Sequence, residues 1–168
     1  MQEFIAEQHL FFVSTAPAVG GRVNMSPKGY DSFRVLGEHR VAYQDLTCNG
    51  SETIAHLGEN GRIRFMFCAF DGKPNIVRLC GIGRVVLKGD EDFTELSKHF
   101  EERPGARSII VADIDRTSNS CGYSIPSMEH VGDRTLLVDW AAQRTADDFT
   151  EYWATRNAES IDGLPSLG

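Results

Sequence analysis

The sequence predicts a mainly β fold, a six-stranded antiparallel barrel with peripheral helices. Two observations support this fold class. Six compact apolar or alternating segments follow one another at close spacing, and few helical patterns separate them. A parallel sheet would need longer crossovers between its strands. The predicted strands cover residues 9–15, 22–27, 39–47, 62–70, 75–88 and 107–115.

Turn residues bound these segments. The apolar run HLFFVST is followed by Pro17 and by the pair Gly20-Gly21, which predicts a buried strand and then a turn. RIRFMFCAF leads into the Asp71-Gly72 turn. The long run over 75–88 contains Gly81 and Gly83, which indicate a bulge or a bend in that strand.

Helical patterns lie between and after the strands. The segment 48–61 predicts a helix with Ile54 and Leu57 toward the core and Gly61 at its end. Either Asn49, with Glu52 as its return partner, or Ser51 would cap its start. The remaining helical patterns are a short one at 2–8, an amphipathic one at 90–100, and C-terminal helices over about 134–157.

Length and charge limit the classes of function. The 168 residues form a single predicted domain, residues 1–168, and the net charge is −7. The absence of a Lys/Arg cluster argues against nucleic-acid binding. No apolar run is long enough for a membrane span, and the N-terminus lacks an export leader, so we expect a cytoplasmic protein.

The cysteines and histidines predict no metal site. The four cysteines form no C-x-x-C pair, and the five histidines show no ligand spacing. His56 is expected on the surface of its helix. Structural disulfides are not expected in a chain without an export signal.

The segment VNMSPKG, residues 23–29, alternates apolar and polar side chains. In a strand, Val23 and Met25 share one face, and Asn24, Ser26 and Lys28 share the other. That polar face would meet either water or a polar, anionic ligand.

A second segment favours an anion. Gly50-Ser51-Glu52-Thr53 stands at a predicted helix start, where free backbone N–H groups and the helix dipole attract negative charge. Ser51 and Thr53 add hydroxyl donors. A phosphate between this helix start and Lys28 would be well held.

These segments resemble one known family. GRVNMSPKGYDSFRVLGEHRVAYQDLTCNGSETIAHLGENGRIRFMFCAF, and later VRLCGIGRVV, CGYSIP and NAESIDGLP, are similar to the pyridoxamine 5′-phosphate oxidase-related, FMN-binding proteins. The resemblance covers nearly the whole chain. It implies a split β-barrel that forms a homodimer, with FMN in the clefts between the subunits.

The resemblance also implies the site. Asn24, Ser26 and Lys28 would face the flavin and its phosphate, with Ser51 and Thr53 near the phosphate. Backbone N–H groups of residues 24–26 would serve the pyrimidine edge of the flavin. The predicted cofactor-binding residues are Val23, Asn24, Met25, Ser26, Lys28, Tyr43, Asp45, Ser51, Thr53 and Tyr123.

The expected function is that of an FMN-dependent oxidoreductase, with hydride transfer through flavin N5 and NAD(P)H as one possible donor. No residue is an evident catalytic acid or base. The alternatives are a non-enzymatic protein that binds or stores FMN or haem on the same fold, and a deazaflavin-dependent reductase. The family's C-terminal arginine pattern is missing, since Arg156 stands alone in the last stretch. The pyridoxamine phosphate oxidase reaction itself is therefore not expected.

Overall fold

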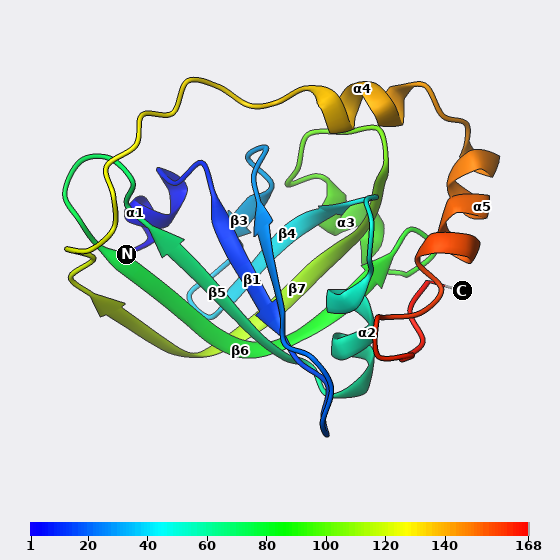
Figure 1. The fold of residues 1–168 in the computed structure, drawn as a ribbon, viewed down its shortest axis with the longest axis horizontal. Coiled ribbons are helices and arrows are strands. Elements are labelled where there is room, and N and C mark those ends of the chain that lie inside the picture. The colour runs from blue at the N-terminus through cyan, green and yellow to red at the C-terminus, as the bar shows by residue number, and fades with distance from the viewer. Residues whose placement is uncertain (168) are drawn as a thin grey trace.

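The computed structural model describes residues 1–167 and shows one curled antiparallel sheet with helices around it (Figure 1). The sheet has seven strands in the order β2-β1-β5-β6-β7-β4-β3. The strands are β1 (Phe11–Thr15), β2 (Asn24–Lys28), β3 (Phe33–Val35), β4 (Arg40–Leu46), β5 (Arg62–Cys68), β6 (Ile76–Leu87) and β7 (Ala106–Ser120). The mainly β, antiparallel fold class is confirmed.

The prediction of six strands is wrong by one. The additional strand, β3, has only three residues and pairs with β4. Three residues are too few to give a readable alternating pattern. The strand predicted at 107–115 also continues to Ser120, because β6 pairs along its full length.

Aromatic side chains show how tightly the sheet curls. The Phe11 and Phe33 rings lie 5.0 Å apart, centroid to centroid, although four strands separate β1 from β3 in the sheet order. Phe65, Phe67 and Tyr43 pack in the same interior. The inside of the barrel is therefore filled with side chains, as expected for a small barrel.

A bulge bends β6 against β7. The register shifts after Cys80, which pairs with Arg116, whereas Gly81 pairs with Ile114. A Cβ atom at Gly81 would lie 2.0 Å from the carbonyl oxygen of Asp113, so only glycine permits this approach of the two strands. An irregularity is thus present at Gly81 as expected, but the extra residue, Asp115, belongs to β7 and not to β6.

Within residues 1–167, five helices surround the sheet: α1 (Gln2–Ala6), α2 (Glu52–Glu59), α3 (Phe93–Ser97), α4 (Leu136–Ala142) and α5 (Ala146–Arg156). Ile54 and Leu57 of α2 lie in the main core, as predicted. None of the helices within residues 1–167 is long and apolar enough to cross a bilayer. After β7 the chain passes over the top of the view to α4 and α5, and its C-terminal end returns to α2 (Figure 1).

The start of α2 agrees with the predicted cap Ser51 in position only, and not with Asn49. Ser51 occupies the N-cap position, but its hydroxyl makes no cap hydrogen bond and donates instead to the Asn157 carbonyl oxygen. The Asn49 amide oxygen accepts from the Tyr152 hydroxyl, and the Glu52 carboxylate accepts from the Ile161 N–H. The C-terminal part of the chain therefore forms hydrogen bonds with all three side chains that were predicted to cap this helix.

Candidate functional site

The polar face of β2 points into the barrel. Because β2 pairs with β1 so that Lys28 opposes Phe11 and Asn24 opposes Thr15, its polar residues share the side of the buried residues of β1. Val23 and Met25 lie on the outside, with 71% and 61% of their surface exposed. Pairing with β1, which the sequence of β2 cannot show, sets this orientation.

Lys28 ends in a buried ionic cluster. Its Nζ lies 3.0 Å from Oδ1 of Asp45, and Arg107 Nε donates to Oδ2 of the same carboxylate at 2.7 Å. Arg107 also donates to the amide oxygen of Asn157 and to the Gly50 carbonyl oxygen. We call Lys28, Asp45, Arg107 and Asn157 the Asp45 cluster.

Charge in this cluster is unbalanced. One carboxylate faces two cations, and Asp45 and Arg107 are almost fully buried. Burial by itself raises the pKa of the Asp45 carboxyl, but Lys28 and Arg107 lower it by more, so the pKa lies below its ordinary value and the group is ionised. The cluster thus carries a surplus positive charge, and Lys28, whose side chain is 17% exposed, is its cation nearest to solvent.

A second polar cluster connects β2 to α2. Asn24 Nδ2 donates to Thr53 Oγ1 at 3.1 Å, and Ser26 Oγ donates to Asn24 Oδ1. Thr15 Oγ1 lies 3.0 Å from His56 Nδ1. His56 is fully buried, so its expected place on the helix surface is wrong, since this face of α2 packs against β1. These five residues form the Asn24 cluster.

Tyr43 lies beside the Asp45 cluster. The Lys28 Nζ is 5.8 Å from the centre of its ring, and the residue is completely buried. Burial raises the pKa of Tyr43 well above its ordinary value, and Asp45 adds to that rise, while Thr53 and Arg107 oppose it. The hydroxyl is one of three buried side-chain polar atoms without a hydrogen-bond partner among the described residues; the others are His56 Nε2 and Ser108 Oγ.

Seven of the ten predicted residues meet in or next to these clusters: Asn24, Ser26, Lys28, Tyr43, Asp45, Ser51 and Thr53. Val23 and Met25 turn their side chains outward. Tyr123 follows β7, is 82% exposed, and makes no hydrogen bond or ring contact with either cluster within residues 1–167.

The sequence interpretation missed Arg107, Asn157, Thr15 and His56. One feature of the sequence pointed to Arg107: it is a charged residue at the start of the apolar run RSIIVADID. Asn157 gave none, because its role depends on the return of the C-terminal segment to α2. That segment, residues 157–167, also donates the Ser166 hydroxyl to the Ser51 carbonyl oxygen.

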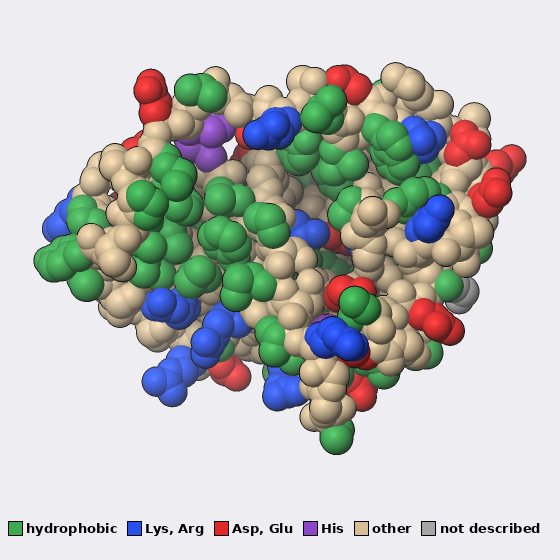
Figure 2. Space-filling view, in the orientation of Figure 1, with side chains coloured by type: hydrophobic (Ala, Val, Ile, Leu, Met, Phe, Trp, Pro, Cys, Tyr) green, Lys and Arg blue, Asp and Glu red, His purple; other side chains and the backbone are tan. Residues whose placement is uncertain are grey.

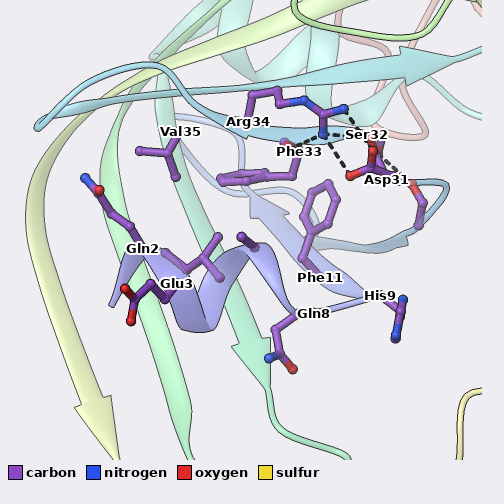
Figure 3. Close-up of a pocket in the computed structure, with 13 residues that line it drawn as sticks. Gln2, Glu3, Gln8, His9, Phe11, Asp31, Ser32, Phe33, Arg34 and Val35 are labelled. Atoms are coloured by element: carbon purple, nitrogen blue, oxygen red, sulfur yellow. Dashed lines mark hydrogen bonds and ion pairs between the residues drawn. The ribbon is translucent and has the colours of Figure 1, made fainter.

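The large cavity drawn in Figure 3 lies elsewhere. It has a volume of about 500 Å³ between α1 and β3 and contains none of the ten predicted residues. Its one cationic side chain, Arg34, donates to both carboxylate oxygens of Asp31. Because Asp31 neutralises Arg34, the part of this cavity that the structure describes has no unpaired Lys or Arg for an anion.

The sequence from residue 1 to residue 143 matches the pyridoxamine 5′-phosphate oxidase family model. The chain belongs to the pyridoxamine 5′-phosphate oxidase family. A relative in Aspergillus flavus, the pyridoxamine 5′-phosphate oxidase family protein ustO, is 38% identical over 184 residues, which cover 99% of this chain and 74% of ustO. The family resemblance expected from the sequence is confirmed.

Solved structures share the fold of this pyridoxamine 5′-phosphate oxidase family member. HupZ of Group A Streptococcus matches with a TM-score of 0.56 and 21% identity, over 77% of this chain and 96% of HupZ. An FMN-binding protein of Syntrophomonas wolfei matches with a TM-score of 0.52 and 16% identity, over 68% of this chain and 78% of that one. At these identities the likeness concerns the fold alone.

Proposed function

We propose that the protein binds FMN at Lys28, the cation of the Asp45 cluster nearest to solvent, and along the half-exposed edge strand β2. The observation that carries the proposal is the surplus positive charge of Lys28 and Arg107 around the single carboxylate of Asp45. FMN ends in a phosphate dianion, which needs a cation and hydrogen-bond donors. Family membership and the fold shared with an FMN-binding protein support the same cofactor.

The residues present fit such a cofactor. The buried Tyr43 hydroxyl has no partner within the described chain, and a bound ligand would supply one. β2 is an edge strand, so part of its backbone N–H groups are not used by the sheet and are free for the polar edge of a flavin. Lys28, Asn24 and Thr53 would hold the cofactor. The role predicted for Ser51 stays a prediction, because Asn157 engages its hydroxyl here.

We further propose that the protein is an oxidoreductase. Bound FMN supplies hydride transfer through its N5 atom. The contribution of this chain is binding and charge: Lys28 and Arg107 favour the anionic phosphate, and the unpaired backbone N–H groups of β2 would favour the anionic form of a reduced flavin. Asp45 is held as a carboxylate between two cations, which makes it a poor proton donor. NADH or NADPH is the proposed donor.

We propose a homodimer with FMN between the subunits. Support comes from exposed apolar side chains that a second copy would cover, among them Met25, Tyr123, Met128 and Val131. Tyr123 lies apart from both clusters of its own chain. In the proposed dimer it would instead contact the flavin bound by the partner subunit.

FMN titration tests the site. We expect Lys28→Gln to weaken FMN binding by about tenfold or more, because a charge-assisted hydrogen bond is lost. Lys73→Gln, an exposed lysine in the turn before β6, is the matched control and should bind FMN like the wild type. Quenching of flavin fluorescence gives both affinities. Equal affinity in Lys28→Gln and the wild type would show that the site is misplaced.

Anaerobic mixing with NADH or NADPH tests the activity. Loss of flavin colour on the stopped-flow timescale is expected for an oxidoreductase. A protein that holds FMN tightly but is reduced by neither donor fits the storage alternative. Haem is less favoured at this site, because its histidine, His56, is fully buried against Thr15.

A further inference from the structure

We propose that the cavity between α1 and β3 is a second binding site, for an organic ammonium ion with an apolar body (Figure 3). Its volume of about 500 Å³ is within the range of small-molecule sites. Among the described residues, none of those proposed to hold FMN lines this cavity. Apolar side chains gather over β5 and β6 on the face seen in Figure 2, and no residue of these two strands lines the cavity either. The cavity is therefore distinct from the flavin site and from that apolar face.

The cavity runs along one side of α1. Gln2 and Val35 lie at one end, and His9 and Asp31 lie toward the other (Figure 3). Residues 31–35, which comprise β3 and the end of the turn before it, form the wall opposite the helix. A ligand would therefore lie between two walls and be partly enclosed.

The floor between the two ends is apolar. The rings of Phe11 and Phe33 contact each other edge to face, and Ile5 of α1 belongs to the same core. Phe33 and Val35 are only half buried, so both present carbon surface to the cavity. Such a floor favours a ligand with an apolar body, since binding removes this surface from water.

The charged groups at the rim favour a positive ligand. Asp31 accepts from both terminal nitrogens of Arg34, at 2.8 and 2.9 Å, which neutralises the one guanidinium in the lining. The Glu3 carboxylate also lines the cavity and forms no ion pair within residues 1–167. Two carboxylates therefore face one guanidinium. An ammonium ion is attracted by the surplus carboxylate and by the face of an aromatic ring such as Phe33.

A strained turn fixes the carboxylate that masks Arg34. Tyr30 and Asp31 are the two non-glycine residues within 1–167 with a positive φ, at 62° and 50°. This conformation is unfavourable for residues that carry a Cβ atom. The Ser32 hydroxyl holds the turn by donating to the Gly29 carbonyl oxygen at 2.6 Å. Backbone strain of this kind is often retained at ligand sites, and here it places Asp31 against Arg34.

Calorimetric titration with three indoles of similar size tests the charge preference. Tryptamine carries an ammonium group, tryptophol a neutral hydroxyl, and indole-3-propionate a carboxylate. We expect tryptamine to bind the wild-type protein about fivefold or more tightly than tryptophol, and indole-3-propionate to bind most weakly. The titrations are made with FMN at saturation, which keeps the indoles out of the flavin site, and are repeated without FMN.

A pair of matched variants locates the ammonium group. Glu3→Gln should weaken tryptamine binding by about fivefold, because the surplus carboxylate is lost. Glu7→Gln is the control: it removes an exposed carboxylate from the same N-terminal segment, and Glu7 does not line the cavity. Its tryptamine affinity should stay within about twofold of wild type. Both side chains are exposed, so both variants should unfold at the wild-type urea concentration.

Asp31→Asn should reverse the charge preference. Asparagine accepts a positive φ as aspartate does, so the turn is retained. Arg34 then lacks its carboxylate but keeps its hydrogen bonds to the carbonyl oxygens of His99 and Phe33. We expect indole-3-propionate to gain about tenfold or more in affinity, because a charge-assisted hydrogen bond to Arg34 becomes available, and tryptamine to lose affinity.

Four results would overturn the proposal. The first is a wild-type protein that binds none of the three indoles, and the second is equal affinity for all of them. The third is an equal loss in Glu3→Gln and Glu7→Gln, which would reduce the effect to the net charge of the protein. The fourth is an Asp31→Asn protein that still prefers tryptamine.

FMN affinity separates this site from the flavin site. Glu3→Gln should keep wild-type FMN affinity, and Lys28→Gln should keep wild-type tryptamine affinity in the absence of FMN. If Lys28→Gln weakens tryptamine binding instead, the indole occupies the flavin site and no second site exists. A protein that binds tryptamine in this pattern but does not bind FMN would refute the proposed cofactor and leave the second site intact.

Discussion

At the scale of single residues, Asp45 determines the electrostatics of the site. It is 1% exposed and bonded to Lys28 and Arg107 at once. Removing one partner of a buried ion pair leaves the other charge uncompensated, which costs about 3–5 kcal/mol. The carboxylate therefore neutralises part of the charge of two cations that would otherwise repel each other.

We predict that Asp45→Asn lowers the free energy of unfolding at pH 7 by about 3 kcal/mol. The pKa of Asp45 is lowered in the folded state, so its contribution is present above the unfolded pKa, about 3.9, and is lost as the pH falls through the folded pKa. The difference in unfolding free energy between wild type and variant should therefore disappear at acidic pH. Urea denaturation as a function of pH measures it.

The control for this prediction is Asp115→Asn, an exposed residue in the β7 bulge. Its unfolding free energy should stay within about 0.5 kcal/mol of wild type throughout. A gap between wild type and Asp45→Asn that persists unchanged in acid would show that the carboxylate is not ionised in the fold.

At the scale of elements, the bulge in β7 shapes the outer face. Gly81 lets β6 approach β7 closely at the point where Asp115 of β7 has no partner in β6. Because Asp115 is skipped, Arg116 pairs with Cys80. Bulges often redirect side chains at functional surfaces. The position of Arg116 thus depends on one glycine.

Gly81→Ala should destabilise the protein by about 2–3 kcal/mol, because the new Cβ would collide with the Asp113 carbonyl oxygen and force the strands apart. Gly89→Ala is the control, since nothing lies within 4 Å of a Cβ there. Denaturation midpoints compare the two. Equal stability of both variants would contradict the tight approach at Gly81.

The C-terminal segment is the second element that matters. Asn157, which is fully buried, accepts from Arg107 and donates to the Cys48 carbonyl oxygen. It lies beyond the 143 residues that match the family model. The chain therefore supports its site with a part that the family pattern does not include.

At the scale of the whole molecule, the proposed homodimer gives a direct prediction. Light scattering on the purified protein should yield twice the chain mass of 18.6 kDa. Exposed apolar side chains such as Met25 and Tyr123 would be covered in the pair. A mass of one chain, with FMN binding intact, would refute the dimer as the site of the cofactor. A cytoplasmic location stays a prediction.

The fold was largely predictable because strand signals are local. Alternation and turn residues identified six of seven strands, and Gly81 marked the bulge. β3 was not predicted, because three residues are too few to show an alternating pattern. Half of the site was predictable for a different reason: Asn24, Ser26 and Lys28 alternate along one strand, and Ser51 and Thr53 share one helix start.

The sequence by itself determined the antiparallel fold, the family, and the polar face of β2. Only the tertiary structure decided where that face points and what it meets. Pairing with β1 turned Lys28 inward, and the curl of the sheet brought it to Asp45, while the chain's return placed Asn157 on Arg107. The reason is physical: alternation along one strand is local, but a buried charge is stable only beside partners that distant segments supply.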